Sequence, residues 1–357
     1  MSGFDPDAAA SGDGLFGLPY TPEEAALVLI PVPWDATTSY RAGTSRGPEA
    51  ILSASRQVDL FDLDTGRPWQ AGIAMLPISD EVLGWNAAAR ALAEPVIAAG
   101  GPVTPELAEA VSHVNLASER LNAWVEHLAT HWFERGKIVG IVGGDHSTPL
   151  GAIAAAARVA PGLGILHIDA HADLREAYEG FTYSHASIMH NVLERVPEVK
   201  RLVQVAIRDV GEREVERIQR DAGRIVTFYD TDIREELFAG QPFSEVCRHM
   251  IAKLPQDVWI SLDIDGLDPA LCPNTGTPVP GGLQLAELIC LLRHLVASGR
   301  HIVGFDLNEV APGPDGDEWD GNVGARVLYK LCGMTLVSQG LVPRPPGFIR
   351  PPPPPSL

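Results

Sequence analysis

The segment Ile165-Leu-His-Ile168, followed directly by Asp169-Ala-His171-Ala-Asp173, decides the fold that this sequence predicts. A short and continuously apolar run is typical of a parallel β-strand that is covered on both faces. In the extended residues that follow, side chains two positions apart point to the same side. Two carboxylates and one imidazole can therefore converge on one point, where buried acidic groups favour a bound cation.

Similar apolar runs alternate with longer helical patterns along the rest of the chain. The predicted strands span 26–32, 138–142, 164–168, 202–207, 224–228, 258–262 and 302–307. The predicted helices span 107–135, 149–158, 186–195, 212–221, 231–252 and 284–297. This alternation predicts a single-domain, three-layer α/β/α fold around a mostly parallel, doubly wound sheet.

The ends of the chain and one internal segment differ in composition from this repeating part. Residues 1–17 are rich in Gly, Ala and Asp and are predicted to be disordered, and the Pro-rich tail 343–357 is predicted to be disordered and exposed. One folded domain is expected over 18–342. Within it, the Ala-rich segment 65–118 is expected to add helices near the rim or at a subunit contact.

The charge, the apolar runs and the cysteines of the chain argue against several classes of protein. The net charge is -19, which argues against the clustered Lys and Arg of a nucleic-acid-binding surface. No apolar run approaches the length of a membrane span, and the N-terminus lacks the pattern of a signal peptide. The four cysteines have no CxxC spacing, which favours reduced thiols and a cytoplasmic location.

Three further strand ends carry residues of the same chemical kind. They are Gly143-Gly-Asp-His146-Ser147, Asp263-Ile-Asp265-Gly-Leu-Asp-Pro269 and Asn308-Glu309. Each motif alone is commonly a helix cap or a solvated turn. Ligands of open α/β sheets bind beyond the carboxyl ends of the strands, so the repetition of these motifs at predicted strand ends indicates a metal site.

The candidate ligands are two imidazoles and four carboxylates. They are His146, Asp169, His171, Asp173, Asp263 and Asp265. Without a thiolate, this set favours Mn, with Ni, Fe or Co as alternatives, over structural zinc. Six ligands exceed the need of one catalytic ion, so the sequence predicts two ions, about 3.5–4 Å apart, that activate a water between them.

The chain resembles the ureohydrolase family of arginases and agmatinases, and looks most like an agmatinase. Besides the motifs above, the resemblance rests on the blocks Pro33-Trp-Asp-Ala-Thr-Thr-Ser-Tyr-Arg-Ala-Gly43 and Thr275-Gly-Thr277-Pro-Val-Pro-Gly-Gly282, and it covers roughly 31–332. It implies hydrolysis of a guanidino C–N bond to urea and an amine. It also implies two Mn²⁺ per subunit, with Ni²⁺ as the alternative, and a homo-oligomer, either a trimer or a hexamer.

The resemblance also implies a role for each ligand. His146 and Asp173 would hold one ion and His171 and Asp265 the other. Asp169 and Asp263 would bridge the two ions, and Asp173 would in addition orient the attacking water.

Three further residues receive roles from the resemblance. Glu309 would bind the guanidinium, whose paired N–H groups fit a carboxylate. Thr277 would position the substrate through its backbone or hydroxyl. His185 would carry a proton to the leaving amine, although it also suits the start of the helix predicted at 186–195. His167, inside a strand, is expected to be a core residue.

The identity of the substrate is left open. Leu174-Arg175-Glu176-Ala-Tyr178 departs from the small polar residues of arginases, which counts against arginine. If Arg175 faces the pocket, it would repel the ammonium of agmatine and suit a guanidino acid such as guanidinobutyrate. If it pairs with Glu176 or Glu179, it carries no information about the substrate.

Other functions are also compatible with these motifs. Bulky residues at Phe181, Tyr183 and Trp319 could shrink the pocket until it takes free guanidine. Formiminoglutamate hydrolysis would use the same chemistry. From other classes, the alternatives are an inactive regulatory subunit, a single-zinc deacetylase and a phosphoesterase, the last without a glycine-rich phosphate cradle.

Overall fold

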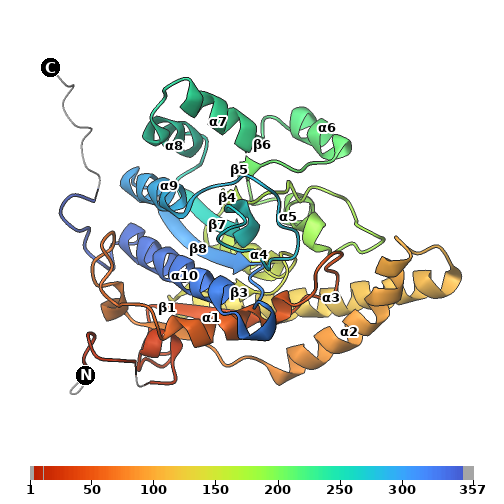
Figure 1. The fold of residues 1–357 in the computed structure, drawn as a ribbon, viewed down its shortest axis with the longest axis horizontal. Helices are drawn as coiled ribbons and strands as arrows, with labels where there is room; N and C mark the ends of the chain where they lie inside the picture. The colour runs from red at the N-terminus through yellow and green to blue at the C-terminus, as the bar shows by residue number, and fades with distance from the viewer. Residues whose placement is uncertain (1–3, 11, 349–357) are drawn as a thin grey trace.

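The protein is built on one sheet of eight parallel strands, in the order β2-β1-β3-β8-β7-β4-β5-β6. The computed structural model describes residues 4–10 and 12–348 (Figure 1). The strands are β1 (Leu27–Val32), β2 (Ile73–Met75), β3 (Ile138–Gly143), β4 (Gly164–Ile168), β5 (Arg201–Ile207), β6 (Ile225–Tyr229), β7 (Asp257–Asp263) and β8 (His301–Asn308). The seven predicted strands and the parallel sheet are confirmed, and only the short edge strand β2 was not predicted.

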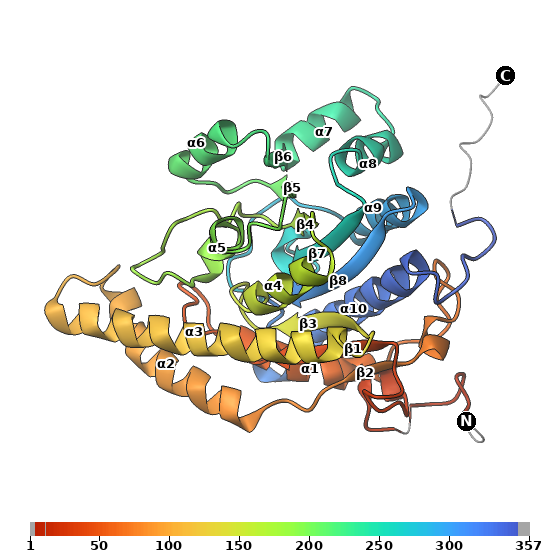
Figure 2. The same ribbon diagram turned by 180° about the vertical axis from the view of Figure 1, so that it is seen from behind.

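The helices cover both faces of this sheet. They are α1 (Gly47–Ser55), α2 (Asp80–Ala98), α3 (Pro105–Phe133), α4 (Leu150–Val159), α5 (Ile188–Arg195), α6 (Glu212–Arg220), α7 (Asp230–Phe238), α8 (Phe243–Ile251), α9 (Leu285–Ala297) and α10 (Trp319–Ser338). One apolar core joins the sheet to α1 and α7–α10, and a second joins its other face to α2–α6. The predicted three-layer α/β/α architecture is therefore confirmed (Figures 1 and 2).

One prediction about helices was wrong, and two helices, α1 and α10, were missed. The stretch 231–252 is not one helix but two, α7 and α8, because Gly240 adopts a left-handed φ of 90° and Pro242 cannot continue a helix. Helix α10 was not predicted. It is buried on nearly all sides, so its sequence lacks the one-sided apolar period that marks a surface helix.

Ordered structure begins before the predicted boundary at residue 18. Leu15 and Phe16 are buried in the core, and the ring of Phe16 lies 4.7 Å from that of Tyr329. At the other end, Phe348 is buried and its carbonyl oxygen accepts a hydrogen bond from Arg293 Nε at 2.7 Å. The start of the predicted tail thus packs on the body, and 349–357 lie outside the described residues.

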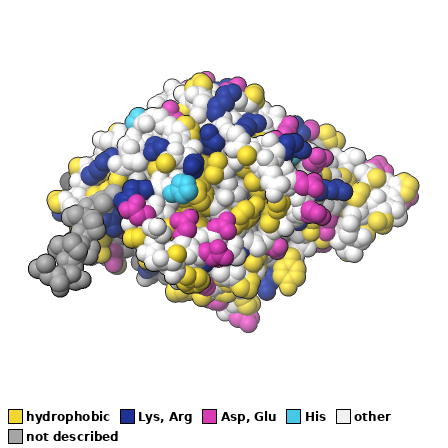
Figure 3. Space-filling model, turned by 90° about the horizontal axis from the view of Figure 1, so that it is seen from above, with side chains coloured by type: hydrophobic (Ala, Val, Ile, Leu, Met, Phe, Trp, Pro, Cys, Tyr) yellow, Lys and Arg dark blue, Asp and Glu magenta, His cyan; other side chains and the backbone are white. Residues whose placement is uncertain are grey.

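The predicted insertion 65–118 contains β2, α2 and the first part of α3. Helices α2 and α3 form an antiparallel pair, here called the α2–α3 hairpin, that extends beyond the edge of the sheet (Figure 2). Within the described ranges, no helix has the length and apolarity needed to cross a membrane. On the face seen in Figure 3, basic and acidic side chains of the described residues are interspersed rather than gathered into one basic stripe.

Candidate metal centre and pocket

The carboxyl ends of three strands bring the predicted metal ligands together, and a fourth strand between them adds Glu309. In the sheet, β3, β8, β7 and β4 are neighbours, and each one ends in a motif identified in the sequence. All six candidate ligands lie at this edge, five of them buried and His171 half-buried. The parallel topology thus turns four separate sequence motifs into one cluster.

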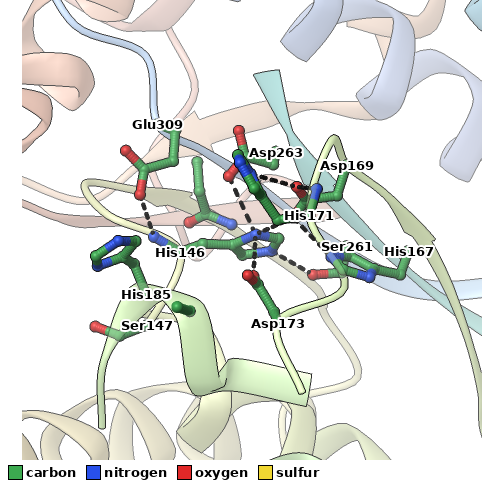
Figure 4. A network of polar contacts seen from close by, with 12 residues as sticks. His146, Ser147, His167, Asp169, His171, Asp173, His185, Ser261, Asp263 and Glu309 are labelled. Atoms are coloured by element: carbon green, nitrogen blue, oxygen red, sulfur yellow. Dashed lines mark hydrogen bonds and ion pairs between the residues drawn. The ribbon is translucent and has the colours of Figure 1, made fainter. Parts of the chain in front are cut away.

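His146 lies at the centre of the first group of ligands (Figure 4). Its Nδ1 is 3.0 Å from Asp169 Oδ2, 3.3 Å from Asp263 Oδ2 and 3.4 Å from Asp173 Oδ2. One ring nitrogen therefore faces three carboxylates. Such a convergence of nitrogen and oxygen donors can hold a divalent cation.

His171 forms the second group together with Asp265 and the other oxygen of Asp169. Its Nδ1 lies 3.2 Å from Asp265 Oδ2 and 3.5 Å from Asp169 Oδ1. Because its two oxygens face different histidines, Asp169 lies between the two groups. Each group brings at least three donor atoms close enough to share an ion, so the cluster suits two ions.

The protonation of the cluster also fits bound cations. Burial, and then the charge of neighbouring carboxylates, raises the pKa of Asp173 and of Asp263 well above the usual range. Burial alone lowers the pKa of His146, but hydrogen bonds to Asp169 and Asp263 raise it well above its usual value. Divalent cations would neutralise this excess of negative charge and keep the carboxylates ionised.

Polar side chains on strands β7 and β8 form a hydrogen-bonded chain with the metal ligand His146. His146 Nε2 is 2.9 Å from Ser261 Oγ, and Ser261 donates to Asp306 Oδ1 at 2.8 Å. These residues were missed by the sequence analysis. Ser261 precedes Asp263 by two positions, and this same-face spacing in an apolar strand was the available signal.

His167 supports the centre in a similar way. Its Nε2 lies 2.8 Å from Asp169 Oδ2, and its Nδ1 lies 3.0 Å from Gln204 Nε2. Since Gln204 Nε2 is a donor, Nδ1 is the acceptor and Nε2 carries the proton that is donated to Asp169. His167 is therefore a fully buried, hydrogen-bonded residue, as expected, and it also orients Asp169.

A cavity of about 260 Å³ opens above the metal ligands. Glu309 lies at its inner end, where Oε1 accepts a hydrogen bond from the backbone N–H of His146 at 3.0 Å. The other oxygen, Oε2, is buried and has no hydrogen-bond partner among the described residues. Burial and the charge of Asp263 raise the pKa of Glu309 well above its usual value. A cationic ligand with N–H donors would satisfy the bare oxygen and keep the carboxylate ionised.

His185 and Thr277 also line the cavity. His185 is the first residue of a 3-10 helix and half-buried, with Nε2 3.4 Å from Ser39 Oγ, so it lies at a helix start and faces the pocket. Burial, together with the positive charge of His171, lowers the pKa of His185 to about 4. Thr277 Oγ1 lies 3.4 Å from Asp265 Oδ2, next to the metal ligands.

Arg175 lines the outer part of the cavity, but its predicted ion-pair partner was wrong. It pairs neither with Glu176 nor with Glu179. Its Nε lies 3.7 Å from Glu214 Oε2 on α6, and its guanidinium lies 5.0 Å from the centre of the Tyr178 ring. Arg175 therefore faces the pocket and also lies within ion-pair distance of Glu214, a combination that neither sequence-based alternative contained.

The three bulky residues expected to narrow the pocket do not line it. Phe181 packs against α2 and α3, Tyr183 donates a hydrogen bond to Glu119 at 3.2 Å, and Trp319 donates one to the carbonyl of Ala270 at 3.0 Å. The outer wall is instead formed by other residues, which sequence analysis did not assign to the pocket. They are Ser39, Tyr40, Tyr178 and Asp209.

Comparisons with known proteins agree with this geometry. The model of the arginase family matches residues 25–333. The chain is 36% identical over 332 residues to N(1)-aminopropylagmatine ureohydrolase of Thermus thermophilus, which covers 92% of this chain and 97% of that protein. It is 29% identical to proclavaminate amidinohydrolase of Streptomyces clavuligerus, with coverage of 83% and 84%.

Solved structures share the fold. Agmatine ureohydrolase of Thermoplasma volcanium superposes with a TM-score of 0.71 at 23% identity, covering 93% of this chain and 97% of that one. Arginase of Bacillus subtilis gives a TM-score of 0.61 at 22% identity, covering 86% and 98%. At these identities the structural likeness supports the fold, and the family match comes from the sequence.

Proposed function

This chain belongs to the arginase family and is a hydrolase of amidino carbon–nitrogen bonds, and from that premise we propose that its substrate is a guanidino compound with a positively charged amine at the far end. Its reaction releases urea and an amine, as in the agmatinase-like ureohydrolases. The observation that carries the choice of substrate is the charge of the outer pocket, where Arg175 has a carboxylate partner and Asp209 has no cationic partner among the described residues.

Asp209 is an exposed carboxylate on the pocket wall. Among the described residues, no side-chain or backbone donor pairs with it. Arg175, the one basic residue of this wall, has Glu214 as its partner. The wall therefore carries one unmatched negative charge, which an ammonium group of the substrate would neutralise.

At the inner end of the pocket, we assign guanidinium binding to Glu309. Its free oxygen, Oε2, and the paired N–H groups of a guanidinium are complementary. The backbone N–H of His146 already binds Oε1, so the carboxylate is held in place before the substrate arrives. Thr277 lines the same pocket and supplies a hydroxyl that can help to position the bound group.

The metal ligands would be divided between two ions. His146 and Asp173 would hold one ion, His171 and Asp265 the other, and Asp169 and Asp263 would bridge them. When bound, the ions supply Lewis acidity and an activated water. Hard oxygen and imidazole donors without a thiolate support Mn²⁺, with Ni²⁺ as the alternative. Asp173 would also orient the attacking water through its carboxylate.

We assign proton transfer to the leaving amine to His185. Its Nε2 is near Ser39 Oγ on the pocket wall, so a proton can pass between this nitrogen and the pocket. Burial and the charge of His171 lower its pKa, which makes His185 neutral near pH 7. The bound cations would add positive charge close to His185, which would also favour its neutral form.

One experiment distinguishes this proposal from its alternatives. Purified protein is loaded with Mn²⁺ or Ni²⁺, and urea release is measured from N(1)-aminopropylagmatine, agmatine, guanidinobutyrate, free guanidine and arginine. We expect the highest kcat/KM with the two amine-bearing compounds. A preference for guanidinobutyrate or guanidine would contradict the role of the outer pocket, and no urea from any compound would favour an inactive subunit.

Two further proposals concern the whole protein. We propose a homo-oligomer, either a trimer or a hexamer, supported by the family and by the exposed apolar side chains Leu83, Leu92 and Leu116 on the α2–α3 hairpin. A cytoplasmic location stays a prediction, supported by four free cysteines. Light scattering of the purified protein measures the first of these directly.

A further inference from the structure

A tight turn presents Tyr178 to the outer pocket. Tyr178 and Phe181 exchange two backbone hydrogen bonds, of 3.1 Å and 2.9 Å. Between them, Glu179 and Gly180 have φ values of 52° and 91°, in the left-handed region that closes two-residue turns. The centre of the Tyr178 ring lies 5.0 Å from the Arg175 guanidinium carbon and 6.1 Å from the centre of the His185 ring. The position of this turn therefore sets the position of one pocket wall.

The turn packs on the α2–α3 hairpin. Phe181 is fully buried in a small apolar core of its own, which contains Ala93 and Val96 of α2 and Val111 and Val114 of α3. A Cβ atom at Gly180 would come within 3.1 Å of the Pro102 ring, which follows α2. The close contact and the buried aromatic ring attach the turn to the hairpin.

Asn115 of α3 adds hydrogen bonds to these apolar contacts. Its Oδ1 accepts from the backbone N–H of Thr182 at 2.9 Å, and its Nδ2 donates to the carbonyl of Gly180 at 3.5 Å. One bond holds the turn itself, at Gly180, and the other holds Thr182, the residue that follows the turn. Asn115 does not itself line the pocket, so any effect on the substrate must pass through the turn.

The same hairpin holds the opposite wall of the pocket. Arg90 of α2 donates to the carbonyl of Thr38 at 2.6 Å, next to Ser39. Asn86 binds Asp35 through two hydrogen bonds, of 2.8 Å and 2.9 Å. One pair of helices therefore contacts two of the loops that border the pocket.

We propose that the α2–α3 hairpin is a positioning element for the substrate, and that Asn115 acts through the Tyr178–Phe181 turn to place the Tyr178 ring against the tail of the substrate. The identity of that tail rests on the function proposed above. The segment that leads to His185 has further anchors, which do not involve the hairpin. Asn191 of α5 donates to the carbonyl of Thr182 at 2.8 Å, and Ser184 caps the helical turn that begins at His185.

The test compares Asn115→Ala with wild type, using the metal-loaded enzyme and two substrates, agmatine and free guanidine. Loss of one hydrogen-bonding side chain is expected to raise KM for agmatine about threefold to tenfold. We expect kcat for agmatine, and kcat/KM for guanidine, to change by less than about twofold, because the reacting end of the pocket is anchored elsewhere. Hydrogen exchange of the Phe181 amide should increase.

Two variants give the comparison its controls. Asn115→Asp keeps the acceptor for the Thr182 N–H and should restore most of the wild-type KM. Ser112→Ala removes a hydroxyl that bonds only to the carbonyl of Ala108 in the same helix, and should behave as wild type. Alanine favours a helix, so Asn115→Ala is expected to fold.

Three outcomes would overturn the positioning role. They are unchanged exchange at Phe181, an unchanged KM for agmatine despite faster exchange, or a parallel loss of kcat for both substrates. Absence of urea release by wild type from any guanidino compound would instead overturn the proposed function. In that case the exchange measurement still decides whether Asn115 holds the turn.

Discussion

Asp169 is the residue on which both halves of the metal centre depend. Its Oδ2 faces His146 and His167, and its Oδ1 lies near His171 Nδ1 and accepts the backbone N–H of the same residue at 2.6 Å. Sequence spacing placed Asp169 and His171 on one side of an extended segment. The residues that follow β3 and β7 are brought close to Asp169 by the sheet, because strands far apart in sequence end at the same edge.

Replacement of either His171 or Asp265 by Asn should abolish most of the activity and leave the fold intact. Each substitution removes one donor from the same half of the centre, and the expected loss in kcat is at least about 100-fold. Urea release, metal content per subunit and circular dichroism measure the effect. Near-normal turnover in a purified variant would contradict the ligand assignment.

Asp209→Asn tests recognition of the substrate's amine. The change keeps the shape of the side chain and removes its charge. Because Asp209 is exposed, the expected rise in KM for agmatine is modest, about threefold to fivefold. Guanidine, which has no second amine, serves as the control substrate. The role of Asp209 would be refuted by equal effects on both compounds.

At the scale of elements, the largest difference from expectation is the segment 65–118. It was predicted to add helices near the rim or at a subunit contact, with no role in the pocket assigned to it. In the structure, its helices hold the loops that border the pocket, through Arg90, Phe181 and Asn115. The Arg90–Thr38 and Asn115–Thr182 contacts join residues that are 52 and 67 positions apart in the chain, so no local pattern could reveal them.

Arg90→Ala should destabilise the protein. The guanidinium donates to the carbonyls of Thr38 and Asp35, and loss of hydrogen bonds from a charged group costs roughly 1.5–3 kcal/mol in the free energy of unfolding. Arg90→Lys keeps one charged donor and should lose less. Urea denaturation of the metal-loaded protein measures both, and equal stability of Arg90→Ala and wild type would contradict the contact.

At the scale of the whole molecule, the protein concentrates buried acidic groups at one edge of its sheet. The raised pKa values of Asp173 and Asp263 mean that the folded, metal-free protein retains protons that the unfolded chain has released. Since the unfolded pKa is about 3.9, the stability of the metal-free protein falls as pH rises from that value through the folded pKa. The raised pKa of His146 acts in the same direction, because the stabilising charge of this imidazole is lost as pH rises.

Removal of metal should therefore lower Tm, and the loss should be larger at about pH 8 than at about pH 5. Binding of an ion at 100 to 1,000 times its Kd stabilises a protein by roughly 3 to 4 kcal/mol, and ligand deprotonation makes this binding stronger as pH rises. Calorimetry of chelator-treated and Mn²⁺-loaded protein at both values gives the comparison. His171→Asn should reduce the difference, and a loss that is larger at the lower pH would contradict the protonation argument.

The amino-acid sequence by itself determined the architecture and the candidate ligands. Short apolar runs that end in Asp and His carry their information locally, because a strand and the residues after it need only a two-residue period. Parallel topology then requires such ends to meet at one edge, which is why seven strands and six candidate ligands could be predicted together.

Only the tertiary structure decided which residues support the metal ligands and which residues form the walls of the pocket. The pairing of Arg175 with Glu214, the support of His146 by Ser261 and Asp306, and the packing of Phe181 on the α2–α3 hairpin join segments that are distant in sequence. Helix α10 belongs with them, because a helix buried on nearly every side has no polar face to mark it. These features depend on which surfaces meet after folding, and a local pattern in the chain does not encode that choice.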